Sequence, residues 1–214
     1  MTTRGSVVAV CLSAEGGVPK HPQAEVNVGP HGIVGDFHAG ETSRHGTSAG
    51  QPNKRQVSVV AEEAVTDAAA QLGIEIPRGG LGENVLVSGL GDLGELQPGQ
   101  RLHFSSGVEL QVTEQNNPCK NLMVWHPQVP KHLMGRRGVV STVLTPGRLR
   151  PGDTVEIDGV ACRQASQRYA FASLTSSSDT PSLKRQQLRP SAFASYIARS
   201  AMRMSSSALL PQLG

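Results

Sequence analysis

Short runs of Val, Ile and Leu recur between residues 6 and 157 of the chain, and polar residues alternate with them. Turn sequences such as QPGQ, SSG and RPGD separate the runs. Short β-branched runs between turns of this kind predict strands. We expect strands at residues 6–13, 24–28, 56–61, 84–89, 100–104, 108–114, 138–144 and 153–157.

A helical pattern is clear in one place, EEAVTDAAAQLG at residues 62–73. Acidic residues stand in its first turn and Gly73 stands where a helix usually ends. A shorter helix is expected at 127–134, with Pro130 in its first turn. Many short strands with few helices predict a mainly β fold, a closed or nearly closed β-barrel with one or two short helices.

The composition divides the chain near Arg163. Residues 1–162 carry 13 Lys/Arg and 16 Asp/Glu, whereas residues 163–214 carry seven Lys/Arg, one acid and 12 serines. Such a tail buries little apolar surface, so we expect it to be disordered or partly helical. SAFASYIARSAMRM (191–204) could form a short amphipathic helix, but membrane contact by the tail is not expected. The predicted organisation is a barrel domain at 1–162 and a Ser/Arg-rich tail at 163–214.

The charge balance and the cysteines exclude some classes of protein. The slightly acidic body gives no reason to expect a nucleic-acid surface. Three sparse cysteines argue against a disulfide framework and for a reducing compartment. The apolar run near the start is too short for a signal sequence or a membrane span. These observations predict a cytoplasmic protein.

One cysteine has an unusual setting, in NNPCKNL at residues 116–122. Pro118 fixes its own φ angle and favours an extended Asn117, so the arm is stiff and presents Cys119 at the end of a predicted strand. Lys120 is adjacent, and a nearby cation favours the thiolate that attacks electrophiles or binds soft metals. The alternative is a small buried hydrophobic residue, which is the expected role of Cys11 and Cys162.

Two other clusters carry polar groups that suit an anion. RGGLGENV (78–85) offers a glycine-rich backbone, but a strand follows it, so it is neither a P-loop nor a dinucleotide-binding turn. The alternative is an ordinary tight turn. The second cluster has no zinc-site spacing and could equally be a solvated loop. It contains His31, Asp36, His38, Arg44, His45, Lys54 and Arg55.

The ordered set GIVGDFHAG, PNKRQVSVV, GGLGENVLVSGL, GELQPGQRLHF, LQVTEQNNPCKNL and RRGVVSTVLTPGRLRPGDTVEI resembles the MOSC domain, named for the C-terminal domain of molybdenum-cofactor sulfurase. The resemblance covers about residues 5–158. It implies a β-barrel with a functional cysteine at Cys119, acting in sulfur transfer or molybdenum-cofactor binding. Some relatives bind the cofactor through that cysteine and reduce N-hydroxylated compounds. Asn116, where an arginine often stands, and Phe37, where a polar residue often stands, depart from the pattern.

The resemblance, with the chemistry of the clusters, gives a set of candidate residues. Catalytic roles fall on Cys119, Lys120 and Asn117, with Cys119 also the metal ligand. Asp36, His38, Arg55, Gly80, Gly82, Glu83 and Asn84 are expected to bind the cofactor, molybdopterin carrying molybdenum.

The implied partners are a small-molecule substrate or sulfur donor and an electron-transfer protein. The desulfurase domain of the sulfurases is missing from these 214 residues, so pyridoxal phosphate is not expected. A non-catalytic binding module with an idle Cys119 is the alternative.

Overall fold

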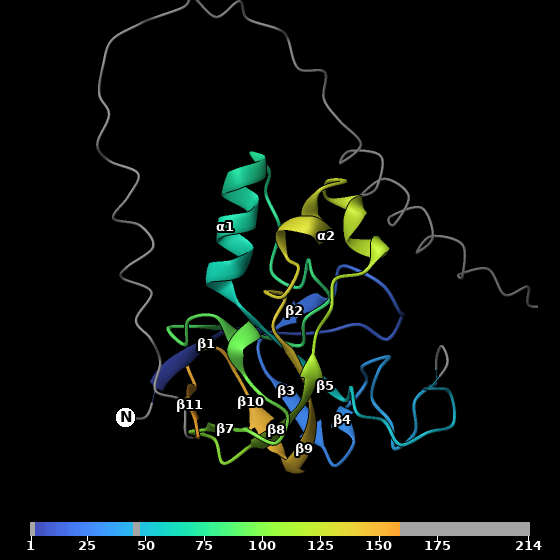
Figure 1. The fold of residues 1–214 in the computed structure, drawn as a ribbon. Coiled ribbons are helices and arrows are strands. Elements are labelled where there is room, and N and C mark those ends of the chain that lie inside the picture. Colours follow the sequence, from blue (N-terminus) through green and yellow to red (C-terminus); the bar gives the residue numbers. More distant parts are fainter. Residues whose placement is uncertain (1–2, 45–47, 159–214) are drawn as a thin grey trace, which may run out of the picture. The chain divides into compact units, whose positions relative to one another are not determined.

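The computed structural model describes residues 3–44 and 48–158. Its main sheet has the strand order β11-β7-β8-β9-β5-β6-β1-β2, and β11 also pairs with β1. In the described part of the chain, seven strands therefore close into a barrel, and β2 extends one side (Figure 1). The barrel strands are β1 (Thr3–Leu12), β5 (Val57–Ala61), β6 (Val85–Ser88), β7 (Arg101–Phe104), β8 (Glu109–Gln115), β9 (Val139–Thr145) and β11 (Thr154–Ile157).

Barrel closure depends on β1, which is long enough to pair with three neighbours. Its start pairs antiparallel with β11, from Thr3 opposite Ile157 to Ser6 opposite Thr154. Its middle pairs with β6 across a register shift, and its end pairs with β2 (His21–Gln23). The shift suits a strand that must turn from one partner to the next.

A β-α-β unit supplies the parallel pair of the barrel, β5 and β6. Helix α1 (Glu62–Leu72) follows β5 directly and carries two acids in its first turn. It ends at Gly73, whose φ of 63° lies in the left-handed region that glycine adopts without a steric penalty. The other pairings between described strands are antiparallel.

Smaller elements complete the domain. A second sheet has the order β10-β3-β4. Its strands are β3 (Val26–Gly29), β4 (Gly32–Ile33) and β10 (Gly147–Leu149), and the short helices are η2 (Leu93–Glu95), η3 (Lys120–Val124) and α2 (Val129–His132). Helices α1 and α2 lie at the same end of the barrel (Figure 1). None of the described helices is long and apolar enough to cross a membrane.

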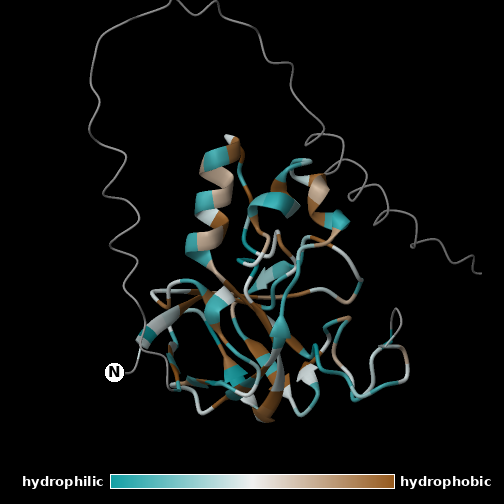
Figure 2. Cartoon of the chain, in the orientation of Figure 1, coloured by the Kyte–Doolittle hydropathy of each residue, from teal (hydrophilic) through white to brown (hydrophobic). Residues whose placement is uncertain are grey.

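Two apolar clusters stabilise the fold, and the barrel strands carry most of the apolar colour in Figure 2. The larger cluster fills the barrel with Val, Leu and Ile side chains. The smaller one lies between the barrel and the helices. It joins Cys11 and Leu86 of the strands to Val65 of α1, Leu122 of η3 and Leu133 beside α2. The segment after Cys119 is thereby anchored to the barrel.

The barrel and both expected helices are confirmed. Each of the eight expected strands is found within a few residues of its predicted position, and α2 is shorter than expected, with Pro130 in its first turn. The strands β2, β4 and β10 and the helices η2 and η3 were not predicted from the sequence. The predicted boundary at 162/163 and the tail lie outside the described residues.

Candidate functional site

The residues that follow β8 form an arm, Asn116 to Cys119, that joins the barrel to η3. Asn116 is buried, and its N–H donates to the carbonyl of Gly138 at 2.9 Å. The arm ends at Cys119, which is extended (φ −118°, ψ 167°) and precedes the first residue of η3. Cys119 is exposed, whereas Cys11 on β1 is fully buried. The arm therefore presents one accessible thiol.

A buried arginine lies behind this thiol. Arg137 is only 8% exposed, and its Nη1 is 3.9 Å from the Sγ of Cys119. The same Nη1 donates to the carbonyl of Asn117 at 3.0 Å, and Nη2 donates to the carbonyl of Leu81. Its buried Nε has no hydrogen-bond partner, and no carboxylate in the described residues forms an ion pair with it. Its hydrogen-bond partners are neutral, so Arg137 adds positive charge behind Cys119. Burial lowers the pKa of Arg137, and the interaction with Cys119 and the charge of Glu83 oppose that change.

The position of Arg137 depends on the glycine that follows it. Gly138 has a φ of 89°, and a Cβ there would lie 2.2 Å from the carbonyl oxygen of Val59 on β5. No side chain fits at that distance. Gly138 thus lets the start of β9 approach β5 closely, which brings Arg137 under the arm.

The glycine loop at 78–84 is held from inside by Glu83. This carboxylate is 1% exposed and accepts the N–H groups of Gly79 at 2.6 Å and Leu81 at 3.0 Å. The N–H groups of Gly80 and Gly82 donate to the carbonyls of Pro77 and Gly79. These four N–H groups therefore bond to the protein itself, and the sequence-based reason for expecting the loop to bind an anion is weakened.

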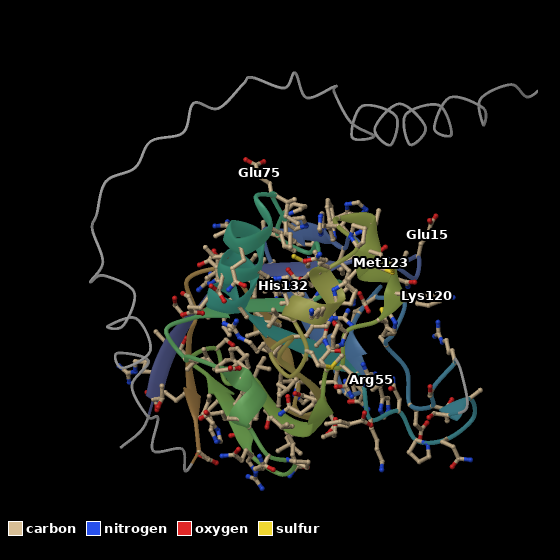
Figure 3. The ribbon with its side chains drawn as sticks, turned by 45° about the horizontal axis from the view of Figure 1, so that its top comes forward. Glu15, Arg55, Glu75, Lys120, Met123 and His132 are labelled. Carbon is tan, nitrogen blue, oxygen red and sulfur yellow. The ribbon has the colours of Figure 1, made fainter. Side chains whose placement is uncertain are left out.

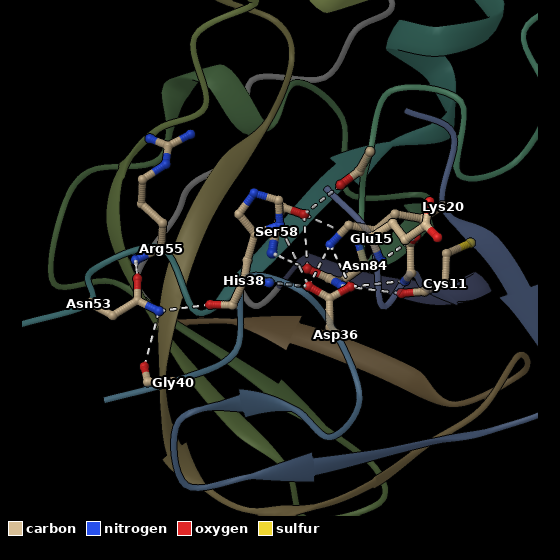
Figure 4. Close-up of polar contacts among 12 residues, drawn as sticks. Cys11, Glu15, Lys20, Asp36, His38, Gly40, Asn53, Arg55, Ser58 and Asn84 are labelled. Atoms are coloured by element: carbon tan, nitrogen blue, oxygen red, sulfur yellow. Dashed lines mark hydrogen bonds and ion pairs between the residues drawn. The ribbon is translucent and has the colours of Figure 1, made fainter. Parts of the chain in front are cut away.

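A second group, the frame, consists of the buried Lys20, Asp36 and Asn84 with the partly buried Ser58 (Figure 4). The Nζ of Lys20 is 2.8 Å from Asp36 Oδ2, and both side chains are at most 2% exposed. The Nδ2 of Asn84 donates to Asp36 at 3.1 Å, and its Oδ1 accepts the N–H of Ser58 at 3.1 Å. The frame ties together segments that are far apart in the sequence.

Electrostatics keep the central carboxylate of the frame ionised. Burial alone would raise the pKa of Asp36, but hydrogen bonds from His38 and the charge of Lys20 hold it below the usual range of a carboxyl group. Burial in turn lowers the pKa of Lys20, and Asp36 opposes that change. Burial is also the main cause that raises the pKa of Glu83, against the hydrogen bonds of the loop. These carboxylates act as structural acceptors in this structure.

Two further candidates lie nearer to the solvent. Arg55 donates from Nη2 to the Oδ1 of Asn116 at 3.0 Å and from Nη1 to Glu114 at 3.1 Å. The side chain of His38 is 44% exposed, and its Nδ1 is 3.7 Å from Asp36. Asn53 joins the two, because it donates to the carbonyl of His38 and accepts the N–H of Arg55. Asn116 thus orients Arg55 beside the arm.

A tryptophan fixes the segment beyond the thiol. The Nε1 of Trp125 donates to the carbonyl of Gly80 at 2.7 Å. Leu122, Val129 and Leu133 are fully buried beneath the same segment. The arm, the glycine loop and the η3–α2 segment are therefore connected around Cys119 by hydrogen bonds and apolar contacts.

The predicted site residues fall into two sets. The outer set is at least partly accessible to a ligand and contains Cys119, Asn117, Lys120, Arg55 and His38. The inner set belongs to the frame or the glycine loop and contains Asp36, Glu83, Asn84, Gly80 and Gly82. Except for a partly exposed Gly82, the inner residues are buried.

Sequence reasoning missed three residues of this region, Lys20, Trp125 and Arg137. A signal existed for Arg137, since two arginines precede a predicted strand in GRRGVVS and the second occupies a strand-edge position. Lys20 and Trp125 gave no comparable signal, because their partners, Asp36 and Gly80, are distant in the sequence.

The described residues contain no group of three or more His, Cys, Asp or Glu side chains that could hold a metal ion. A metal at Cys119 would therefore need most of its ligands from another molecule. A cofactor that brings its own sulfur ligands fits this donor set. The charge of Arg137 fits an anionic group, whereas Arg55 is paired with Glu114.

The family model of the MOSC domain matches residues 35–156, and the barrel fold agrees with this match. The chain belongs to the MOSC domain family. The chain is similar to YuaD of Bacillus subtilis (strain 168), a curated protein whose name links it with metal-sulfur cluster biosynthesis. The two sequences are 36% identical over 145 residues, which cover 59% of this chain and 76% of YuaD.

Solved structures give the same result for the fold. The crystal structure of YuaD from Bacillus subtilis matches with a TM-score of 0.66 and 28% identity, over 73% of this chain and 97% of that one. YiiM from Geobacillus stearothermophilus matches with a TM-score of 0.52 and 21% identity, over 72% and 73%. YiiM from Escherichia coli matches with a TM-score of 0.53 and 17% identity, over 73% of this chain and 70% of that one. At these identities the YiiM structures support the fold alone.

Proposed function

We propose that this protein carries sulfur on Cys119, as a persulfide that it receives from a donor and passes to an acceptor. The observation that carries the proposal is the exposed thiol of Cys119, 3.9 Å from the buried guanidinium of Arg137. A cation favours the thiolate, which is the nucleophile in sulfur exchange. Similarity to YuaD supports a role in sulfur chemistry.

The transfer needs no oxidant or reductant. The thiolate of Cys119 attacks the terminal sulfur of a donor persulfide, R–S–SH. A new S–S bond forms at Cys119 as the bond in the donor breaks, and the donor leaves as its thiolate. Arg137 and Lys120 would stabilise the negative charge on the attacking sulfur and on the product persulfide.

A second candidate function is favoured by the MOSC family match and by the exposed thiol of Cys119. In it, Cys119 binds the metal of a molybdenum cofactor, and the pterin part supplies the remaining sulfur ligands. The bound molybdenum would supply two-electron redox chemistry, as needed to reduce N-hydroxylated compounds. Arg55, Lys120 and Arg137 would meet the anionic groups of the cofactor.

One preparation tests both candidates. The protein is made in a host that synthesises the molybdenum cofactor, and its metal content and visible spectrum are measured. A second sample is treated with a low-molecular-weight persulfide and analysed by peptide mass spectrometry. A sulfur carrier should gain one sulfur atom at Cys119, removable by a thiol reductant, and contain little molybdenum. The cofactor protein should contain near-stoichiometric molybdenum that Cys119→Ser loses.

Cys162→Ala is the matched control, because it removes a thiol that is not among the predicted site residues. If Cys119 gains no sulfur and the protein binds no molybdenum, Cys119 is idle. The binding-module alternative would then hold.

A further inference from the structure

The segment that follows Cys119 exposes more apolar surface than its neighbours. Five large hydrophobic side chains are exposed among the described residues, and three of them lie here. Met123 is 49% exposed, and Val124 and Met134 are each 62% exposed. The opposite side of the segment is anchored to the barrel, so these side chains cannot turn inward. The elements η3 and α2 contact each other, and exposed apolar side chains on neighbouring elements commonly mark an interaction site.

The same segment is basic. No Asp or Glu occurs between residues 115 and 152, whereas this stretch holds six of the 13 Lys/Arg of residues 1–162. Arg136 is neutralised by Asp67 at 2.6 Å. Lys120 and Lys131 are exposed, and neither forms an ion pair in the described part of the structure. We call the set Lys120, Met123, Val124, Lys131 and Met134 the η3–α2 surface.

The η3–α2 surface begins beside the thiol. Cys119 directly precedes the first residue of η3, and Figure 3 shows Lys120 and Met123 pointing outward from this short helix. Sulfur transfer between two proteins requires contact between sulfur atoms, whereas electron transfer does not. A surface adjoining the thiol therefore suits a partner that must bring its own sulfur to Cys119.

We propose that the η3–α2 surface docks an acidic protein that donates persulfide sulfur to Cys119. This inference rests on the proposed sulfur-carrier function. The donor presents carboxylates to Lys120 and Lys131 and an apolar patch to the two methionines. Its persulfide then meets the thiolate of Cys119, and it leaves as a thiolate after the transfer described above.

Charge argues against two other occupants. A second copy of this chain, docked symmetrically, would place Lys120 and Lys131 close to the same residues of its partner. The C-terminal segment 163–214 carries seven Lys/Arg against one acid, so it too would be repelled. An acidic partner avoids both conflicts, and like charges facing each other at an interface are strongly unfavourable.

Two synthetic peptide persulfides test the proposal. One is rich in Asp, Glu and Leu, and the other has Lys in place of each acid. At low salt we expect the acidic peptide to transfer sulfur to Cys119 about 10-fold faster than the basic one. High salt should remove most of that preference, because it screens exposed charges. Equal rates for the two peptides at low salt would overturn the proposal.

Variants locate the effect. Lys131→Glu should lower the preference for the acidic peptide roughly three-fold or more, and Met134→Ser should slow the acidic peptide at high salt as well. Arg101→Glu, on β7, makes the same charge change at an exposed residue that forms no ion pair within the described part of the chain, and it should leave the preference unchanged. An equal loss in Arg101→Glu would show that only net charge matters and would refute a docking surface here.

A binding measurement separates docking from chemistry. The same peptides with serine in place of cysteine are titrated by fluorescence anisotropy. Stronger binding of the acidic peptide, weakened by Lys131→Glu, supports docking even if Cys119 accepts no sulfur, in which case only the proposed function fails. Loss of binding to phosphatidylserine vesicles in Lys131→Glu, with the peptide preference intact, would assign the surface to membranes and contradict the proposal.

Discussion

The polar residues at the thiol end of the barrel form two regions that differ in burial and in bonding. In the frame, Lys20, Asp36 and Asn84 are buried and bond to one another. Around the arm, Cys119 and Lys120 are exposed. The difference shows that much of the polar chemistry in the sequence serves to hold neighbouring segments of the fold together. Frame variants should therefore change stability, and arm variants should change reactivity.

The strongest way to break the frame is Asp36→Asn. It leaves the ammonium group of Lys20 buried without its counter-charge, and removing one partner of a buried pair typically costs about 3–5 kcal/mol. Denaturant unfolding measures the loss. The double variant Lys20→Met/Asp36→Asn should recover part of it, because no charge is then left unpaired.

An exposed ion pair provides the control for this experiment. Arg4 and Glu156 also form a salt bridge, but their side chains are 70% and 35% exposed. Glu156→Gln should cost at most about 1 kcal/mol. If Asp36→Asn lowers the free energy of unfolding by only as much as Glu156→Gln does, the buried pair of Lys20 and Asp36 stabilises the fold no more than this exposed pair.

Acid should weaken the frame selectively. The pKa of Asp36 is lower in the folded protein than the value of about 3.9 in an unfolded chain. Its stabilising contribution is therefore complete above that pH and is lost as the pH falls toward the folded pKa. Urea unfolding from pH 7 to pH 3 compares the wild type with Lys20→Met/Asp36→Asn. Below about pH 4, the free energy of unfolding of the wild type should fall relative to that of the double variant. A constant difference would contradict an ionised Asp36.

The arm should differ from the barrel interior in thiol reactivity. In a Cys162→Ala background, we expect Cys119 to react with iodoacetamide about 100-fold faster than Cys11. Burial raises the pKa of Cys11 to about 12, whereas Cys119 is exposed. Mass-spectrometric mapping at limiting reagent gives both rates. Comparable rates would remove the argument for a special thiol at the arm.

The charge behind the thiol should determine which reagents it prefers. Arg137→Met should lower the rate ratio of anionic iodoacetate to neutral iodoacetamide at Cys119 by about 10-fold, since the nearby positive charge is lost. Arg137→Lys keeps the charge and should retain most of the ratio. If both reagents slow equally in Arg137→Met, Arg137 positions the arm but does not attract anions.

A smaller effect is expected where the η3–α2 segment meets the glycine loop. Trp125→Phe keeps the apolar ring but loses the hydrogen bond to the carbonyl of Gly80. The expected cost is about 1 kcal/mol in denaturant unfolding. A loss several times larger would show that the indole contributes mainly through packing, and Trp125→Leu would then be worse still.

The barrel could be predicted because its strands carry their own signal. Runs such as VELQVTE alternate apolar and polar positions, and turn residues mark their ends. The strands β2, β4 and β10 span only two or three residues and contain Pro or Gly. Their geometry comes from pairing with β1 and β3, which no local pattern reveals.

The site could be predicted in part. The accessible Cys119 followed from its polar neighbours and the proline before it. The glycine loop was expected to offer free N–H groups, but Glu83 accepts two of them, and a carboxylate two to four residues away can satisfy a loop in this way. The role of Arg137 depends on the close approach of β9 to β5, which is a property of the folded barrel.

The pairing of β1 with β11 also constrains when the protein can fold during synthesis. Residues 3–6 leave the ribosome early, but their partners at 154–157 are added about 150 residues later. At about 5–20 residues per second, that interval is roughly 8–30 s. Until then β1 has an open edge, which is a surface on which strands of other chains can pair. Crowding of nascent chains during overproduction should therefore reduce the yield of soluble protein. The free energy of unfolding of the barrel that does fold should stay the same.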